Sequence, residues 1–357
     1  MDNNISEYST RINSYYNRRD INLDIVKGIG IIAVIVGHLS PYGVKFIFSF
    51  HMPLFFVIAG FLYKQTSLKQ SIHKDFKRLI IPYIITGLLI YLLDLLASAI
   101  WPHDTMHWLI GTLWGNGSGA HTSALFADIP YIGAIWFLLA LFVCKQTFLI
   151  LQIYSDNLIK LGLLSLTVSI IASLIDTIYI NLPFAILPGL SAVIFYYAGY
   201  AIRRMGMFDR INLWSAIILV AIWVAANYFP EHHLSVVRCY YPIYPLTVLG
   251  GISATILIYC AISNLRKLPI NHMDWIRNIF VWLGEVSLLI MCFHLIELNL
   301  PYLGSLLGFN TIFERIIFNF TFCIIGVVLL SQFPLARNLF KIRQVNIFKL
   351  KKGFICN

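Results

Sequence analysis

The chain has 357 residues, of which 59% are hydrophobic and only 12% are charged, and its mean hydropathy is +0.78. A soluble globular domain is about 45–50% apolar and about 25% charged, so the composition excludes that class of protein. The formal net charge of +10 is compatible with a nucleic-acid partner only if the basic residues form one surface patch, and their distribution, given below, argues against this. We expect an all-α, polytopic integral membrane protein without a nucleic-acid partner.

A transmembrane helix needs about 20 largely apolar residues. Ten segments of the chain meet this description approximately, in the order 24–40, 46–63, 79–101, 131–151, 161–180, 184–202, 212–229, 243–263, 279–299 and 311–333. We therefore expect a bundle of about ten helices in a membrane domain spanning 23–334. A polar tail, 1–22, precedes this domain and a basic tail, 335–357, follows it.

The basic residues predict how these segments are oriented. If the N-terminus is cytoplasmic, all but three of the 26 Lys and Arg residues fall on the cytoplasmic side or at the inner ends of helices; the exceptions are Lys45, Arg238 and Arg315. Cytoplasmic loops of membrane proteins carry such an excess of Lys and Arg. We expect both termini in the cytoplasm, and we attribute the positive charge to orientation and to attraction by anionic membrane lipids.

The first apolar segment carries two ionisable side chains, Lys27 and His38. Eleven helical residues separate them by about 16 Å along the axis and by about 20° around it, so both lie on one helix face. Ionisable residues inside a membrane are costly and are usually functional, although Lys27 also fits a snorkelling anchor and His38 a structural hydrogen bond. Asp24, one turn earlier, either pairs with Lys27 or caps the helix start.

The second apolar segment carries His51 near the end that faces the first segment across a short turn. This hairpin predicts that His38 and His51 lie at similar depth on adjacent helices. A histidine pair is a plausible acid/base site because the reference pKa of imidazole, about 6.5, suits proton transfer near neutrality. The two residues lack an obvious third ligand, so we expect no metal.

Two later stretches add polar residues near or within the membrane. "HKDFKRLIIPYI" (73–84) places Lys77 and Arg78 at the expected inner surface, where they either bind an anionic cofactor or act as an ordinary anchor. "LGEVSLLIMCFHLIELNL" (283–300) carries Ser287 and His294 seven residues apart, hence on one face of a helix.

Five stretches together resemble the acyltransferase family 3 membrane proteins, and especially the branch of fucose 4-O-acetylase-like enzymes and nodulation-factor acetylases. They are "LDIVKGIGIIAVIVGH" (23–38), "FHMPLFFVIAGFLY" (50–63), "FKRLIIPY" (76–83), "IWFLLAL" (135–141) and "LGEVSLLIMCFH" (283–294), and they occur in the family's order. Each stretch is weak alone, but the combination is specific. Lys27 stands where many members of the family carry arginine.

The resemblance implies a ten-helix enzyme of the bacterial plasma (inner) membrane. Such an enzyme takes an acetyl group from cytoplasmic acetyl-CoA and places it on a hydroxyl of a surface glycan or lipid-linked glycan. It implies that His38 is catalytic with His51 assisting, and that Lys27, Lys77 and Arg78 bind the donor. Asp24, Trp136, Ser287 and His294 then support the site. Relatives that modify peptidoglycan often carry an extra domain after the last helix, whereas here we expect only the basic tail, 335–357. We therefore expect an O-antigen (lipopolysaccharide), capsule or exopolysaccharide acceptor.

Two mechanisms and two rival functions remain open from the sequence. His38 either removes the proton of the attacking sugar hydroxyl or carries the acyl group as an acyl-imidazole. A transporter or flippase of a glycan lipid or acyl donor also has many helices and intramembrane polar residues. An acyltransferase that uses succinyl or another acyl group is equally compatible with these residues.

Overall fold

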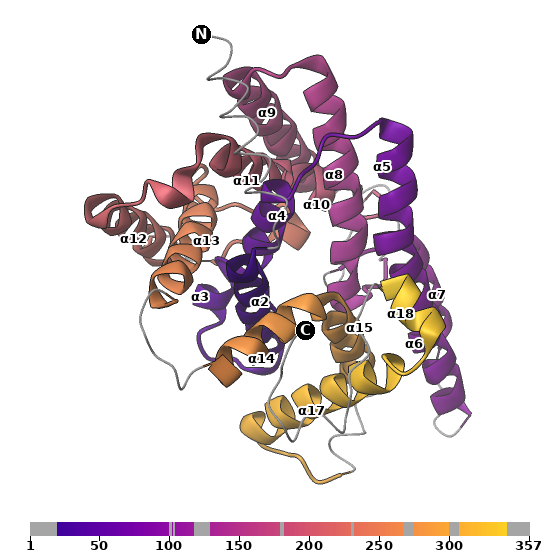
Figure 1. Cartoon of the computed structure of the whole chain (residues 1–357). Coiled ribbons are helices and arrows are strands. Elements are labelled where there is room, and N and C mark those ends of the chain that lie inside the picture. The colour runs from indigo at the N-terminus through magenta and orange to yellow at the C-terminus, as the bar shows by residue number, and fades with distance from the viewer. Residues whose placement is uncertain are drawn as a thin grey trace.

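The computed structural model describes residues 20–99, 102, 104–117, 129–178, 182–229, 232–266, 274–299 and 307–340. Within these ranges the chain is helical, and its only extended pairing is an isolated bridge between Ser235 and Tyr240 (Figure 1). The helices are α2 (Ile21–Leu39), α3 (Val44–Phe48), α4 (His51–Phe61), α5 (Leu68–Asp75), the π-helical turn η1 (Phe76–Ile80), α6 (Ile81–Ser98), α7 (Met106–Trp114), the 3₁₀ turn η2 (Gly133–Ile135), α8 (Trp136–Tyr154), α9 (Leu158–Thr177), α10 (Ile186–Ser191), α11 (Val193–Met205), the 3₁₀ turn η3 (Met207–Asp209), α12 (Leu213–Tyr228), the 3₁₀ turn η4 (Val236–Arg238), α13 (Leu246–Leu265), α14 (Asp274–Glu285), α15 (Ser287–Leu298), α17 (Ile312–Leu330) and α18 (Pro334–Phe340).

The predicted helical membrane fold is confirmed. Eight helices or continuous helix runs within the described residues are long and apolar enough to cross a membrane. Of the two remaining predicted segments, one is the 16-residue α12 and the other is broken. Residues 279–299 were expected to form one helix, but α14 and α15 meet at Val286 with a bend of 73°. Sequence periodicity did not reveal this break, because the segment contains no proline to mark it.

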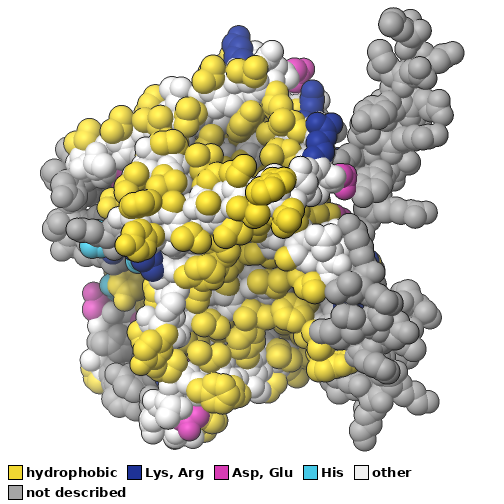
Figure 2. Space-filling view, turned by 90° about the vertical axis from the view of Figure 1, so that its left-hand side faces the viewer, with side chains coloured by type: hydrophobic (Ala, Val, Ile, Leu, Met, Phe, Trp, Pro, Cys, Tyr) yellow, Lys and Arg dark blue, Asp and Glu magenta, His cyan; other side chains and the backbone are white. Residues whose placement is uncertain are grey.

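The helices divide into an inner and an outer group. The run from α10 to α11 and the helices α2, α4 and α8 are largely buried, whereas α6, α9 and α17 expose most of their apolar surface. Figure 1 shows α2 and α4 near the middle, with α12 and α13 on one side and α6 and α7 on the other. Figure 2 shows a broad hydrophobic face with Lys and Arg side chains gathered toward one end. This is the surface expected of a protein whose outer helices contact lipid.

Two close helix crossings depend on glycine. A Cβ added to Gly284 of α14 would lie 1.8 Å from the carbonyl oxygen of Asp24, and one added to Gly28 of α2 would lie 2.3 Å from the Phe280 oxygen. The crossing of α4 and α11 is built the same way, with Gly60 and Gly199 each facing backbone of the other helix. Small residues allow such backbone contact between membrane helices. These crossings fix α2 and α4, which carry His38 and His51.

A buried carboxylate joins α5 to α8. Asp75 is only 2% exposed and accepts hydrogen bonds from the Lys145 ammonium at 2.5 Å and the Gln146 amide at 3.0 Å. The charge of Asp75 is thus paired, as a buried carboxylate requires. The contact holds the turn that carries Lys77 and Arg78 against the bundle.

Candidate active site

One cavity of about 1170 Å³ runs along α2 and brings most of the predicted site residues together. Lys27, Ile31, Val34 and His38 all line it, at the spacing of one helix face. We call its two parts the Lys27 end, which also includes Leu62, Leu79 and Ser287, and the His38 end, which also includes His51, Trp136 and Arg238. The prediction that Lys27 and His38 share one face is therefore confirmed, and that face borders a cavity.

Backbone contacts orient the two predicted catalytic histidines. The Nδ1 atom of His38 lies 2.8 Å from the carbonyl oxygen of Val34, and the Nδ1 atom of His51 lies 2.9 Å from that of Ile47. A carbonyl oxygen only accepts hydrogen bonds, so each Nδ1 carries the proton. In the neutral ring, the lone pair is then on Nε2. The His38 ring is exposed to the cavity, and its Nε2 is a base or nucleophile within it.

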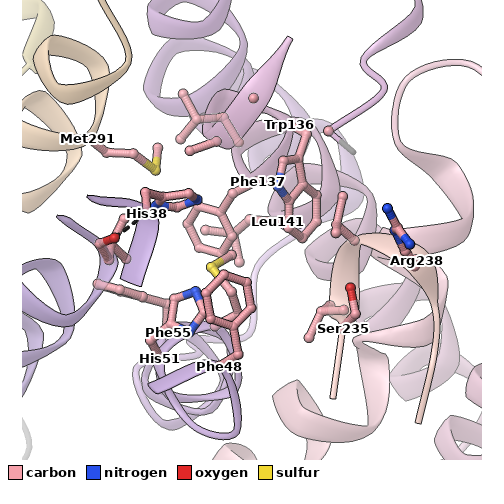
Figure 3. Close-up of a pocket in the computed structure, with 18 of the residues that line it drawn as sticks. His38, Phe48, His51, Phe55, Trp136, Phe137, Leu141, Ser235, Arg238 and Met291 are labelled. Carbon is pink, nitrogen blue, oxygen red and sulfur yellow. Dashed lines mark hydrogen bonds between the residues drawn. The ribbon is translucent and has the colours of Figure 1, made fainter. Parts of the chain in front are cut away.

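His51 shares the cavity with His38, and the Phe48 ring packs near both imidazoles. Ring centroids are 6.1 Å apart for His38 and Phe48, and 4.7 Å apart for Phe48 and His51 (Figure 3). The ring of His51 is only 2% exposed. The hairpin thus places both histidines at one end of the cavity, as predicted.

The imidazole that does lie against His38 is His294. Their ring centroids are 5.3 Å apart with the planes tilted by 48°. His294 is completely buried on α15, and its Nδ1 lies 2.9 Å from Oδ1 of Asn319 on α17. Spacing within one helix identified His294 as polar in an apolar segment, but its contact with α2 depends on the bend at Val286, which the sequence did not indicate.

The sequence left two roles open for Asp24, pairing with Lys27 or capping the helix start, and the structure shows the pairing. Asp24 is buried and pairs with the Lys27 ammonium at 2.7 Å, while Asp20 caps the helix by accepting from the Asn22 amide at 2.8 Å. Ser287 also lines the Lys27 end, and its hydroxyl donates to the carbonyl oxygen of Gly284 at 3.0 Å.

Lys77 and Arg78 do not line the cavity. Both are exposed on the surface of η1, whereas their neighbour Leu79 is buried and borders the Lys27 end. The two cations are therefore next to this end of the cavity but outside it. A role in binding a donor would have to involve the part of that donor that stays at the surface.

Trp136 lines the His38 end together with groups that the sequence reasoning missed. Ser235 and Arg238 also line the cavity, and Figure 3 shows them on the side of Trp136 away from His38. Asp176 also lines this end. Arg238 is one of the three cations that the predicted orientation places outside the cytoplasmic side. That unusual position could have marked it as a candidate site residue. Asp176, at the end of an apolar helix, gave no comparable signal.

His233 lies at the same end and is neutral at pH 7. Partial burial lowers its pKa below 6.5, and the nearby positive charges of Arg238 and Lys45, with His232, lower it further. Its ring packs on Phe48 with centroids 4.8 Å apart. Arg238 thus contributes a permanent positive charge at this end, while His233 contributes an uncharged ring.

The comparison with protein families decides the class. A family model described as an acyltransferase domain, that of acyltransferase family 3, matches residues 20–333. The chain belongs to this acyltransferase family. It is therefore a membrane acyltransferase, and the resemblance noted in the sequence is confirmed.

Individual relatives of this acyltransferase match over shorter regions. Nodulation protein NolL of Mesorhizobium japonicum is 32% identical over 36% of this chain and 34% of its own length. Nodulation protein NolL of Sinorhizobium fredii is 46% identical over 15% of this chain and 19% of its own length. The matched region thus spans 34% and 19% of these curated relatives, respectively. No solved structure was found to match the acyltransferase.

Proposed function

We propose that this acyltransferase moves an acetyl group from cytoplasmic acetyl-CoA to a hydroxyl of a surface-polysaccharide sugar on the opposite side of the bacterial plasma membrane. The observation that carries the proposal is the cavity along α2, which has a cation at one end and an imidazole with a free Nε2 lone pair at the other. Donor and acceptor on opposite sides of a membrane need such a shared meeting point.

The Lys27 end suits the donor. It borders the basic residues of η1, and the helical rise from Lys27 to His38 is about 16 Å. An extended pantetheine arm can span this length between apolar walls such as Ile31 and Leu141. Lys77 and Arg78 then contact the phosphates that remain outside, because arginine gives bidentate and lysine point-charge contacts to phosphate.

The His38 end suits a sugar acceptor. A sugar ring has apolar faces and a polar rim, and this end offers the Trp136 indole together with the polar side chains of Asp176 and Arg238. Binding sites commonly combine aromatic surface with a few polar groups that fix orientation. Both NolL relatives come from bacteria, and this supports a bacterial surface glycan as the acceptor.

His38 performs the proton transfer in this proposal. Its Nε2 takes the proton as the sugar oxygen attacks the thioester carbonyl, a C–O bond forms, and the C–S bond breaks. The proton then passes from His38 to the departing thiolate, so the ring returns to its starting state. The Val34 carbonyl holds the ring in the tautomer that makes Nε2 the acceptor.

Inverted membrane vesicles test this proposal. They are incubated with radiolabelled acetyl-CoA and the glycan lipids of the host, with native protein, His38→Ala and, as a control, His73→Ala, which alters an exposed histidine of α5 outside the cavity. Label should enter the glycan with the native protein and the control but not with His38→Ala. Equal labelling by His38→Ala and native protein, at equal protein level, would contradict the role of His38. No labelling by native protein would contradict the proposed donor or the proposed acceptor.

A further inference from the structure

His294 is buried next to the reacting histidine with half of its hydrogen-bonding capacity unused. Its Nδ1 contacts Asn319, but its Nε2 has no hydrogen-bond partner among the described residues. The His294 ring contacts His38, at 5.3 Å between centroids. A buried polar atom without a partner destabilises a protein, so a reason for its retention is expected.

The neighbours of His294 determine which of its nitrogens carries the proton. The Asn319 amide nitrogen donates to the Glu297 carboxylate, and the same nitrogen lies 3.5 Å from the carbonyl oxygen of His294. A backbone carbonyl oxygen can only accept, and a carboxylate oxygen of Glu297 accepts from the same nitrogen, so Oδ1 of Asn319 faces the imidazole. An amide oxygen also only accepts, so Nδ1 of His294 must donate.

This contact set bridges two helices. Glu297 and His294 are three residues apart on α15, hence on one face, and Asn319 on the neighbouring α17 contacts both. Cys323, one turn after Asn319, lies with its sulfur 3.6 Å from the same Oδ1 and supports its orientation. All four side chains are buried. The orientation is thus fixed away from bulk water.

We propose that Asn319 and Glu297 are positioning residues for acyl transfer, holding the His294 ring with a bare Nε2 beside His38. This inference rests on the proposed function. When His38 Nε2 takes the hydroxyl proton, the His38 ring becomes positively charged. The lone pair on Nε2 of His294 stabilises that charge, and the proton stays on His38 until it passes to the thiolate. The Glu297 carboxylate acts on His38 only through Asn319 and His294.

Activity measurements distinguish positioning from simple packing. Asn319→Leu removes the acceptor for Nδ1 and should lower kcat about 10- to 100-fold while the KM values for acetyl-CoA and glycan change less than about twofold, as for other residues that orient a reacting imidazole. Asn227→Leu is the matched control, since Asn227 also holds neighbouring groups through its amide but lies outside the cavity. A kcat per folded molecule that is unchanged in Asn319→Leu would overturn the proposal.

A polarity swap sharpens the test. Asn319→Asp keeps an acceptor for His294 but places two carboxylates together, so its kcat should fall. Adding Glu297→Gln supplies an amide donor to the new Asp. If orientation is the cause, the kcat of the double variant should be at least about tenfold higher than that of Asn319→Asp. A double variant no more active than Asn319→Asp, although folded by gel filtration in detergent, would contradict the orientation argument.

A spectroscopic measurement separates this inference from the proposed function. In ¹⁵N-histidine-labelled protein, the His294 signals are assigned by their absence in His294→Phe. Native protein should show His294 protonated at Nδ1, and Asn319→Leu should shift the proton toward Nε2. Inactive native protein with this tautomer pattern would contradict the proposed function but retain the positioning arrangement. Native His294 protonated at Nε2 would overturn the positioning arrangement whatever the activity.

Discussion

At the Lys27 end the cavity is walled by helices that cross through glycine contacts, whereas at the His38 end it is closed partly by a loop, 232–240. The backbone of α2 touches α14 directly at Gly28 and Gly284, and Lys27 is held by the buried Asp24. Arg238, by contrast, stands exposed on a 3₁₀ turn. A wall of close-packed helices tolerates little sequence change, while loops tolerate much. This difference fits the proposed assignment of the donor to the Lys27 end and of the acceptor to the His38 end.

The largest expected effect is at His38, where donor and acceptor meet in the proposed reaction. His38→Gln should lower kcat about a thousandfold, within the range for loss of a general base. His51→Gln should lower it only about tenfold, because His51 is buried whereas the His38 ring is exposed to the cavity. Steady-state transfer by purified protein measures both. Equal losses in the two variants would mean that the histidines act as one pair, against the geometry.

The next effect isolates the Lys27 end. Lys27→Met should raise the KM for acetyl-CoA about tenfold, equivalent to about 1.4 kcal/mol, and leave the KM for the glycan unchanged. Because this change leaves the buried Asp24 without its lysine, the double variant Asp24→Asn/Lys27→Met serves as the control for folding. If the glycan KM rises instead, the assignment of the two ends is reversed.

Arg238→Met addresses the His38 end and should raise the KM for the glycan about fivefold with the KM for acetyl-CoA unchanged. Arg277→Met is the control, because Arg277 is an exposed cation of α14, paired with Asp274 and outside the cavity. The result is measured with one glycan at fixed ionic strength, because exposed charges are screened by salt. An unchanged glycan KM would remove Arg238 from the acceptor site.

The sequence predicted the helical face shared by Lys27 and His38 because it depends only on 3.6 residues per turn, a local property. It also predicted helices in all ten apolar segments. It did not predict that His294, rather than His51, contacts His38. That contact depends on how α15 packs after the bend at Val286, and packing between distant helices is not encoded in any single segment.

The polar partners were predicted only where they are local. Asp24 and Lys27 are one turn apart, so their ion pair was among the two roles considered. Asn319 and Glu297 are 22 residues apart and meet across two helices, and neither stood out in the sequence. Arg238 was visible only as a cation on the side expected to lack them. Contacts between distant helices, and the contribution of the 232–240 loop, thus required the structure.

The smallest expected effect concerns Lys77 and Arg78, which lie beside the Lys27 end without lining it. The double variant Lys77→Ala/Arg78→Ala should raise the KM for acetyl-CoA about threefold at low salt, and the difference should shrink as salt screens the exposed charges. Dephospho-CoA thioester, which lacks the ribose 3′-phosphate, should show a smaller difference between native and variant protein. A salt-independent increase as large as that of Lys27→Met would indicate instead that η1 moves inward to line the cavity when the donor binds, which would extend the close-packed donor wall to these two residues.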